Sequence, residues 1–296
     1  MRRWTTTYYT QQLVNGLAAG SIYALVAVGY SLVYSILYLV NFAHGDIYMF
    51  GTFVALSLYE LGLPFLLVAV LACTAGAAIG LLVERVAYRP VRNANRIVPM
   101  VSALGAALVL EAAAQLIWGV QTQPFPQEIP QHMVRVGGVI IGTQQIVIFL
   151  VAVSAVMLFT LILRFTRIGH ATTAVCQDID AARLMGVRVN VVIMCVYAGG
   201  AVLGVIGGML FSMYYNAVYI GMGLLGTTKA WAAAMLGGVG NIYGAVVGGL
   251  LLGVLESMSG TVVGSGYEEA VPLVVIVAVL LLKPAGLFGQ RLTERA

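Results

Sequence analysis

The sequence predicts an all-α, polytopic integral membrane protein with roughly eight transmembrane helices, some of them broken or re-entrant. Of its 296 residues, 61% are hydrophobic and only 9% are charged, and the mean hydropathy is +0.98. Soluble domains carry roughly 25% charged residues. So little charge could not cover a surface in water, whereas hydrocarbon requires no such cover. We expect the first apolar stretch to be a retained span, because it is far longer than a signal-peptide core.

Long runs without a charged residue predict the individual spans. A transmembrane helix needs about 20 apolar residues, so the longest runs must fold back on themselves. Before Glu256 the break is expected at 236–244, where four glycines and an asparagine disfavour a continuous helix. The charge-free runs are Trp4–Gly45, Leu61–Val83, Val136–Leu163, Val189–Thr228 and Ala230–Leu255.

The distribution of arginine predicts the orientation, because short cytoplasmic loops are enriched in Lys and Arg. Segment 164–189 and the loop before residue 97 are expected inside, and segment 121–137 outside. The side of the N-terminus stays open: Arg2 and Arg3 favour the inside, whereas three simple spans before Arg85 would place it outside. The cationic residues that indicate the inside are Arg85, Arg89, Arg92 and Arg96 in one loop, and Lys283, Arg291 and Arg295 at the C-terminal end.

Glycines recur at every fourth residue in two regions. One turn apart on a helix, they let neighbouring backbones approach closely, which is how helices associate in lipid. Helix packing is the plain interpretation, and sliding between two states of a transport pathway is the alternative. The residues are Gly200, Gly204 and Gly208 in one region, and Gly240, Gly244, Gly248, Gly249 and Gly253 in the other.

Two polar features lie within apolar segments. Asn41, His44 and Asp46 bring an amide, an imidazole and a carboxylate close together, either as a functional group or as a turn that caps the following helix. Glu111 lies in the middle of an expected span, where an acidic residue costs about 2.5–3.5 kcal/mol, so it must face protein. Gln115 shares its helix face, and a structural hydrogen bond to a neighbouring helix is the favoured role.

Enzyme signatures are absent from the sequence. There is no GxxxxGK[ST], HExxH or GxSxG motif, and the three histidines, His44, His132 and His170, lie in distant segments. We therefore expect no catalytic residue, no metal site, no cofactor in this chain and no nucleic-acid role. The repeated intramembrane charges of proton relays and voltage sensors are also missing. Energy for any transport is expected from a partner.

The polar segment 164–189 separates two charge-free runs and predicts a docking surface for a soluble partner. A charged face that meets only solvent is the alternative interpretation. The charged residues of the segment are Arg164, Arg167, Asp178, Asp180, Arg183 and Arg188.

This segment resembles the cytoplasmic EAA loop of ABC importer permeases. Asp180-Ala181-Ala182 is followed after three residues by Gly186, with Asp in place of Glu. Arg167-Ile168-Gly169-His170-Ala171, followed by Asp178, is similar to LivH-type permeases of branched-chain amino acid importers. Three further strings resemble that family: Asn41-Phe42-Ala43-His44-Gly45-Asp46, the segment 236–245, and Lys283-Pro284-Ala285-Gly286-Leu287-Phe288-Gly289.

The resemblance implies an ABC importer permease fold: one transmembrane permease domain over 1–296 with a cytoplasmic coupling loop at about 164–189. It implies an ATP-driven importer of branched-chain amino acids in a bacterial or archaeal cytoplasmic membrane. The implied partners are a second LivM-like permease, two ABC ATPase subunits that bind ATP and Mg, a periplasmic or extracellular substrate-binding protein, and the lipid bilayer.

The resemblance also implies roles for individual residues. The expected ATPase-coupling residues are Arg167, Gly169, Asp178, Asp180, Ala181, Ala182, Arg183 and Gly186. The expected pathway residues are Asn41, His44, Asp46, Glu111, Gly237, Gly238, Gly240, Asn241 and Gly244. Related permeases carry amides, urea or other amino acids, so the substrate stays open. A stand-alone channel or secondary carrier, with Glu111 and Asp46 as coupling groups, and a purely structural or receptor-like subunit are the alternatives.

Overall fold

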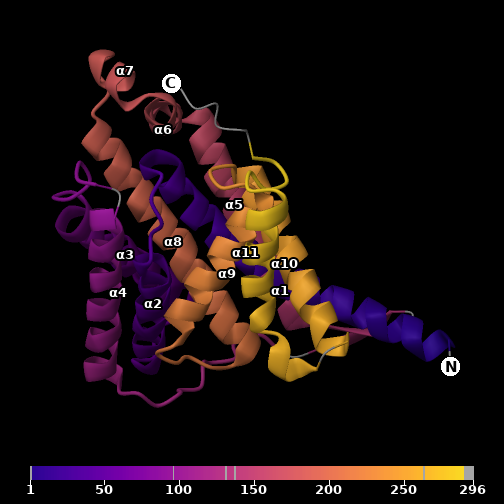
Figure 1. The fold of residues 1–296 in the computed structure, drawn as a ribbon. Helices are drawn as coiled ribbons and strands as arrows, with labels where there is room; N and C mark the ends of the chain where they lie inside the picture. The colour runs from indigo at the N-terminus through magenta and orange to yellow at the C-terminus, as the bar shows by residue number, and fades with distance from the viewer. Residues whose placement is uncertain (1, 96, 131, 137, 263, 290–296) are drawn as a thin grey trace.

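The computed structural model describes residues 2–95, 97–130, 132–136, 138–262 and 264–289. Within these residues the chain is a bundle of α-helices with one antiparallel hairpin, β1 (Met133–Val136) and β2 (Val139–Gly142) (Figure 1). A π-helical turn, Glu84–Tyr88, prolongs α3, and a 3-10 turn, Ser265–Tyr267, precedes α11. The α-helices are α1 (Arg2–Leu37), α2 (Ala43–Glu60), α3 (Phe65–Val83), α4 (Ile97–Trp118), α5 (Thr143–Phe165), α6 (Arg167–Gln177), α7 (Ile179–Leu184), α8 (Val189–Tyr215), α9 (Met222–Gly237), α10 (Ile242–Val262) and α11 (Ala270–Leu282).

The helical membrane architecture is confirmed, but the expected number of eight spans is not. Within the described residues, six helices are long and apolar enough to cross a membrane: α1, α3 with its π-helical turn, α4, α5, α8 and α10. The helices α2, α9 and α11 have 18, 16 and 13 residues and pack among the six. At about 1.5 Å per residue, α9 and α11 are shorter than a bilayer core.

The first charge-free run, Trp4–Gly45, turns as expected, but only near its end. It forms α1, a single helix of 36 residues, which is about 54 Å long at 1.5 Å per residue. The break comes only after Leu37, where Tyr38 has a left-handed φ of 53°. The glycines inside α1 do not interrupt it, because α10 lies against them: a Cβ on Gly16 would meet Val254 Cα at 2.7 Å. Tertiary packing therefore overrides the low helix propensity of glycine.

The two later runs do fold back, as predicted. Asn216, with a left-handed φ of 53°, ends α8 before the chain turns into α9. Gly238 and Gly240 have φ values of 109° and 87° and separate α9 from α10, inside the segment where the break was expected. Only glycine adopts such φ values without strain, so these positions set the turn.

The loops predicted to face opposite sides of the membrane lie at opposite ends of the molecule. The arginine-rich loop and the segment after α5 lie at one end, where Arg92 donates a hydrogen bond to Asn190 at the start of α8 (2.6 Å). The hairpin lies at the other end, beside the first turns of α1, where Gln11 exchanges two 2.8 Å hydrogen bonds with Ile140. The start of α1 is therefore at the end predicted as external. Three charges used for orientation, Arg96, Arg291 and Arg295, lie outside the described residues.

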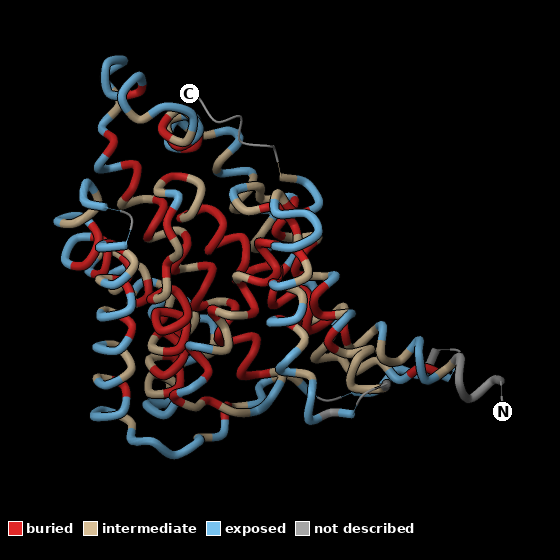
Figure 2. The backbone as a smooth tube through the Cα atoms, viewed as in Figure 1, coloured by how far each residue is buried: buried red, intermediate tan, exposed pale blue. Residues whose placement is uncertain are grey.

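The spaced glycines are packing sites, as predicted. A Cβ on Gly200 would lie 2.9 Å from the carbonyl oxygen of Gly29, and one on Gly249 would overlap the backbone of Ala24. Figure 2 shows that buried residues fill the middle of the bundle, where α1, α8, α9 and α10 meet. Close backbone contact replaces the hydrophobic drive that lipid removes.

We expect Gly253→Ala to lower the thermal midpoint of the purified protein in detergent, because its Cβ would overlap Gly20 and the Gly16 carbonyl. Overpacking of this kind costs about 1–3 kcal/mol. The matched control is Gly105→Ala in α4, where a Cβ would have nothing within 4 Å; it should be neutral or slightly stabilising. Equal melting temperatures for both variants would show that α1 and α10 are not held by this contact.

Candidate coupling segment and buried polar residues

The polar segment 164–189 folds into two short helices at the end of the molecule that carries the arginine-rich loop (Figure 1). Thr166 is the N-cap of α6, and its hydroxyl accepts a hydrogen bond from the amide of Gly169 (3.2 Å). The chain then turns at Asp178 into α7, which has only six residues. This arrangement presents α7 as the tip of the segment.

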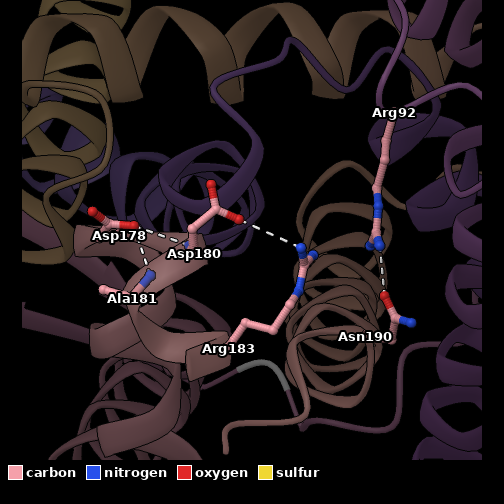
Figure 3. Close-up of polar contacts among 6 residues, drawn as sticks. All are labelled: Arg92, Asp178, Asp180, Ala181, Arg183 and Asn190. Carbon is pink, nitrogen blue, oxygen red and sulfur yellow. Dashed lines mark hydrogen bonds and ion pairs between the residues drawn. The ribbon is translucent and has the colours of Figure 1, made fainter. Parts of the chain in front are cut away.

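Asp178 positions α7 and is its N-cap. Its backbone is extended, with φ −157°, and its Oδ1 accepts hydrogen bonds from the amides of Asp180 (2.9 Å) and Ala181 (3.0 Å) (Figure 3). An N-cap satisfies amides that the helix itself leaves unpaired, and its negative charge suits the helix N-terminus. The sequence placed Asp178 among the ATPase-coupling residues; its contacts are those of a residue that holds their helix.

The outer face of α7 mixes charge with exposed apolar side chains. Arg183 and Asp180 form an exposed ion pair of 3.4 Å, which contributes little to stability. Leu184 and Met185 follow it with 88% and 84% of their surfaces exposed. Sequence reasoning missed these two residues, although two apolar residues directly after the charged string were a visible signal. Gly186 ends the helix with a φ of 84° and open space around it.

The other predicted coupling residues divide between the two faces of the segment. Arg167 and Ala181 are exposed, whereas Gly169 and Ala182 are buried within the chain itself. A Cβ on Gly169 would overlap the backbone of Leu163, so a glycine is required where α6 folds back against α5. The small buried residues thus seat the segment on the bundle.

The inner face of α6 contacts the end of α1. The Cys176 thiol and the Ser35 hydroxyl are 3.4 Å apart, and Tyr38 donates a hydrogen bond to the Cys176 carbonyl (3.3 Å). Burial raises the pKa of the Cys176 thiol, so the thiol is protonated at neutral pH. The polar segment 164–189 is therefore bonded to α1, the most buried of the six candidate spans.

The string around His44 is a buried junction of three helices. Asn41 Oδ1 accepts hydrogen bonds from Ala43 N (3.1 Å) and from the Tyr88 hydroxyl (3.0 Å), just before α2, whose N-cap position is Phe42. His44 is enclosed beside Tyr30, and its Nε2 has no hydrogen-bond partner within the described residues. Asp46 is also buried, next to the start of α9. Both earlier interpretations thus retain support: Asn41 holds the turn before α2, and His44 Nε2 is an unpaired buried atom that needs a role.

Glu111 lies where the sequence placed it, in the middle of α4. It is half-buried and accepts a hydrogen bond of 3.3 Å from Gln115, one turn further along its own helix. The expected hydrogen bond from Glu111 to a neighbouring helix is not found among the residues that the structure describes. The surrounding face of α4 is apolar and exposed, with Leu108 and Leu116 outward.

The segment 236–245 and the C-terminal string, Lys283–Gly289, bind each other. The amides of Leu287 and Phe288 donate to the carbonyls of Leu236 and Gly237, both at 2.9 Å. Asn241 donates to the Phe288 carbonyl (3.2 Å) and accepts from Gly244 N (3.1 Å), which caps α10.

Glycine is needed on both sides of this contact. A Cβ on Gly238 would lie 2.5 Å from Gly289 N, and one on Gly286 would lie 2.5 Å from Gly238 N. Gly240 N donates to the Ser31 hydroxyl on α1 (2.8 Å). The predicted pathway glycines therefore lie at a packed turn in this subunit.

Sequence reasoning missed the buried ion pair. Lys229 on α9 and Glu256 on α10 lie 2.5 Å apart, and Lys229 also donates to the Tyr23 hydroxyl on α1 (2.8 Å). The signal was available, because Lys229 is the single charge that separates two of the charge-free runs. Polar groups thus join α1, α9 and α10 inside the apolar bundle.

Comparison with known proteins connects these features. Residues 12–280 match the family model described as branched-chain amino acid transport system / permease component. This chain belongs to that family. The permease is 38% identical to the high-affinity branched-chain amino acid transport system permease protein BraD of Pseudomonas aeruginosa, over 97% of this chain and 98% of that relative. It is 35% identical to the corresponding LivH of Escherichia coli over the same shares.

A more distant relative and one solved structure extend the comparison. The permease is 28% identical to a probable branched-chain amino acid transport permease protein LivH of Methanocaldococcus jannaschii, over 94% of this chain and 91% of that one. A chain of PsaBC from Streptococcus pneumoniae, solved with Fab, has a TM-score of 0.51, 12% identity and coverage of 92% of the permease and 91% of that chain. At that identity, the similarity supports the fold alone. The family consists of transport permeases and not enzymes.

We expect Asp178→Ala to speed hydrogen exchange at the amides of Asp180 and Ala181, because both lose their acceptor. Loss of an N-cap costs about 1 kcal/mol, which corresponds to roughly fivefold faster exchange. Hydrogen exchange with mass spectrometry measures it. Asp178→Asn, which also caps helices well, is the control and should exchange like the wild type; equal protection in both variants would exclude Asp178 as the determinant of α7.

Proposed function

We propose that the permease forms the membrane pathway of an ATP-driven importer of branched-chain amino acids. In this proposal it forms one transmembrane domain in the cytoplasmic membrane of a bacterium or archaeon. It pairs with a second LivM-like permease and two ABC ATPase subunits that bind ATP and Mg, and an external binding protein delivers the substrate. The observation that carries the proposal is the exposed α6–α7 segment on a chain whose family transports branched-chain amino acids.

The tip of α7 has the chemistry of a docking surface. Leu184 and Met185 expose apolar side chains next to the Asp180–Arg183 pair, at the end of the molecule predicted as cytoplasmic. Protein interfaces typically have an apolar centre and a polar rim. The tip would insert into a groove of the ATPase, with Gly186 turning the chain away at a φ of 84°. A purely solvated charged face does not explain the two exposed apolar residues.

A bonded route leads from this segment into the membrane. Cys176 on α6 contacts Ser35 and Tyr38 at the end of α1. One turn further down α1, Ser31 accepts from Gly240 at the turn between α9 and α10. In our proposal, nucleotide-driven movement of α7 shifts α1 against that turn. Coupling through such a route requires an element with two arrangements, and the glycine-rich turn is our candidate.

The predicted pathway residues keep a supporting role in the proposal. Asn41, His44 and Asp46 lie at the start of α2. Asp46 lies against Gly223 at the start of α9, whereas His44 lies against α1 and α8. Gly237, Gly238, Gly240, Asn241 and Gly244 form the turn that would move. Glu111 lies on α4, whose exposed apolar face is available to lipid or to the second permease. In the conformation described, these residues are packed against protein, so the pathway would open only as helices separate.

The first experiment is uptake by the assembled complex. We expect the purified permease to retain a second permease and ATPase subunits, and we expect proteoliposomes with internal ATP and added binding protein to accumulate labelled leucine. Replacing ATP by a non-hydrolysable analogue should stop uptake, and dissipating ion gradients should not. The opposite pattern would establish the alternative of a secondary carrier.

We expect Gly186→Trp to leave membrane insertion intact and to reduce uptake below about a tenth of wild type, since truncating or blocking a central contact costs 2 kcal/mol or more. Two controls separate blockage from backbone strain. Gly62→Trp places the same side chain at a glycine that also has a positive φ (78°) and open space around it. Gly62 lies at the far end of the molecule, between α2 and α3, so this variant should retain the ATPase. Gly186→Asn tolerates positive φ and should transport. Normal uptake and ATPase binding in Gly186→Trp would remove α7 from the coupling mechanism.

A further inference from the structure

The buried ion pair has no part in docking the ATPase. Only 8% of the Lys229 side chain and 7% of the Glu256 side chain are exposed. Lys229 lies seven residues into α9, so it is about 10 Å along that helix from its external end. Ionisable residues inside a membrane are expensive and mark a functional site by default. Stability alone does not explain a buried salt bridge, because a protein with an apolar pair of similar volume at the same place is often as stable.

We propose that Lys229 and Glu256 recognise the charged backbone of an α-amino acid substrate, with Lys229 binding the α-carboxylate and Glu256 the α-ammonium group. This inference rests on the proposed function, because it names the site at which that transporter holds its substrate. In the conformation described, the two side chains bind each other and the site is closed.

Charge balance favours replacing the Lys229–Glu256 ion pair by ion pairs to the substrate. A zwitterionic amino acid loses water from both of its charged groups when it enters the bundle, and each group needs a partner of opposite sign. Separating Lys229 from Glu256 leaves two partnerless charges, which is strongly unfavourable for a buried pair. A zwitterion between them replaces one ion pair by two and adds no net charge. Opening without substrate would therefore be penalised, and opening with an amino acid would not.

The Glu256 carboxylate has unused capacity. Its Oε1 binds Lys229, whereas Oε2 is buried and has no hydrogen-bond partner within the described residues. A carboxylate accepts at both oxygens, and an ammonium group offers three donors. Tyr23 accepts from Lys229 at 2.8 Å and lies beneath it, with Nζ 4.8 Å from the ring centre, so the lysine is held when Glu256 moves away. An unpaired buried acceptor is rare and needs an explanation.

The wall beside Lys229 is apolar. A cavity of about 10 Å³ adjoins Lys229 and Tyr23, and its other lining residues are Ile22, Val26, Tyr48, Phe211, Gly226 and Ala230. This volume holds roughly one water molecule, so an amino acid enters only when α9 moves relative to α1 and α8. Aliphatic and aromatic side chains next to a charge pair match a substrate with a charged backbone and an apolar side chain.

A structural role for the pair makes a different prediction. An ion pair that only joins α1, α9 and α10 would affect stability, and its loss would not depend on which charge the substrate carries. Two analogues of leucine separate the cases: leucinamide lacks the carboxylate, and 4-methylpentanoate lacks the ammonium group. Leucinamide is therefore tested with the variant that lacks the Lys229 charge, and 4-methylpentanoate with the variant that lacks the Glu256 charge. Each combination tests one contact between a side chain and a substrate group.

The test measures binding of labelled leucine to the assembled complex in lipid nanodiscs without the binding protein, with competition by both analogues. We expect the wild type to bind leucine at least about tenfold more tightly than either analogue, since hydrogen bonds to charged groups contribute that much. Lys229→Met should lose at least about tenfold in leucine affinity and no longer discriminate against leucinamide. Glu256→Gln should also lose at least about tenfold in leucine affinity, and it should no longer discriminate against 4-methylpentanoate. Arg135→Met, which removes an exposed cation on β1, is the control and should bind leucine normally.

Each outcome decides whether Lys229 and Glu256 bind the substrate. Leucine binding within twofold of wild type in an assembled Lys229→Met/Glu256→Gln variant would overturn the inference. So would the absence of saturable leucine binding, or equal binding of leucine and both analogues, in a wild-type complex that transports leucine. These wild-type measurements decide even where a variant does not assemble. A wild-type complex that transports no leucine at all would instead refute the proposed function.

Discussion

Close backbone contact between α1 and α10 is the constraint on which the rest of the structure depends. Gly16 and Gly20 on α1 meet Gly253 and Leu250 on α10, and the missing side chains bring the two backbones together. In lipid the hydrophobic effect does not drive helices together, so such small-residue contacts carry much of the association. They help to bury the central part of α1, and α8, α9 and α5 then pack around it.

The buried α1 also links the polar sites that the proposals use. Along this helix, Tyr23 binds Lys229, Ser31 binds the turn before α10, and Ser35 contacts α6. Polar groups in hydrocarbon must find partners within the protein, and here those partners lie on elements far apart in sequence. A single rigid helix thus touches the coupling segment, the glycine-rich turn and the ion pair. Movement at α6 could reach Lys229 without any contact between the two.

Sequence reasoning succeeded where structure depends on local pattern. The polar segment between two spans, the break before α10 and the packing glycines were all predicted, because charge, turn residues and four-residue spacing are read within a few turns of chain. It was less informative about roles inside the segment: Asp178 and Ala182 hold α7 in place, while Leu184 and Met185 form its exposed tip. Which face of a short helix is buried depends on the bundle beneath it.

The sequence by itself determined the membrane environment, the family and the position of the polar segment 164–189 between two spans. Composition decides the solvent, and short motifs are contiguous. The tertiary structure alone decided that α1 is one long helix, that its start lies beside the external hairpin, and that Lys229 meets Glu256. Tyr23 and Lys229 are 206 residues apart. Their contact depends on how three helices rotate and pack against one another, and no local pattern of residues specifies that rotation.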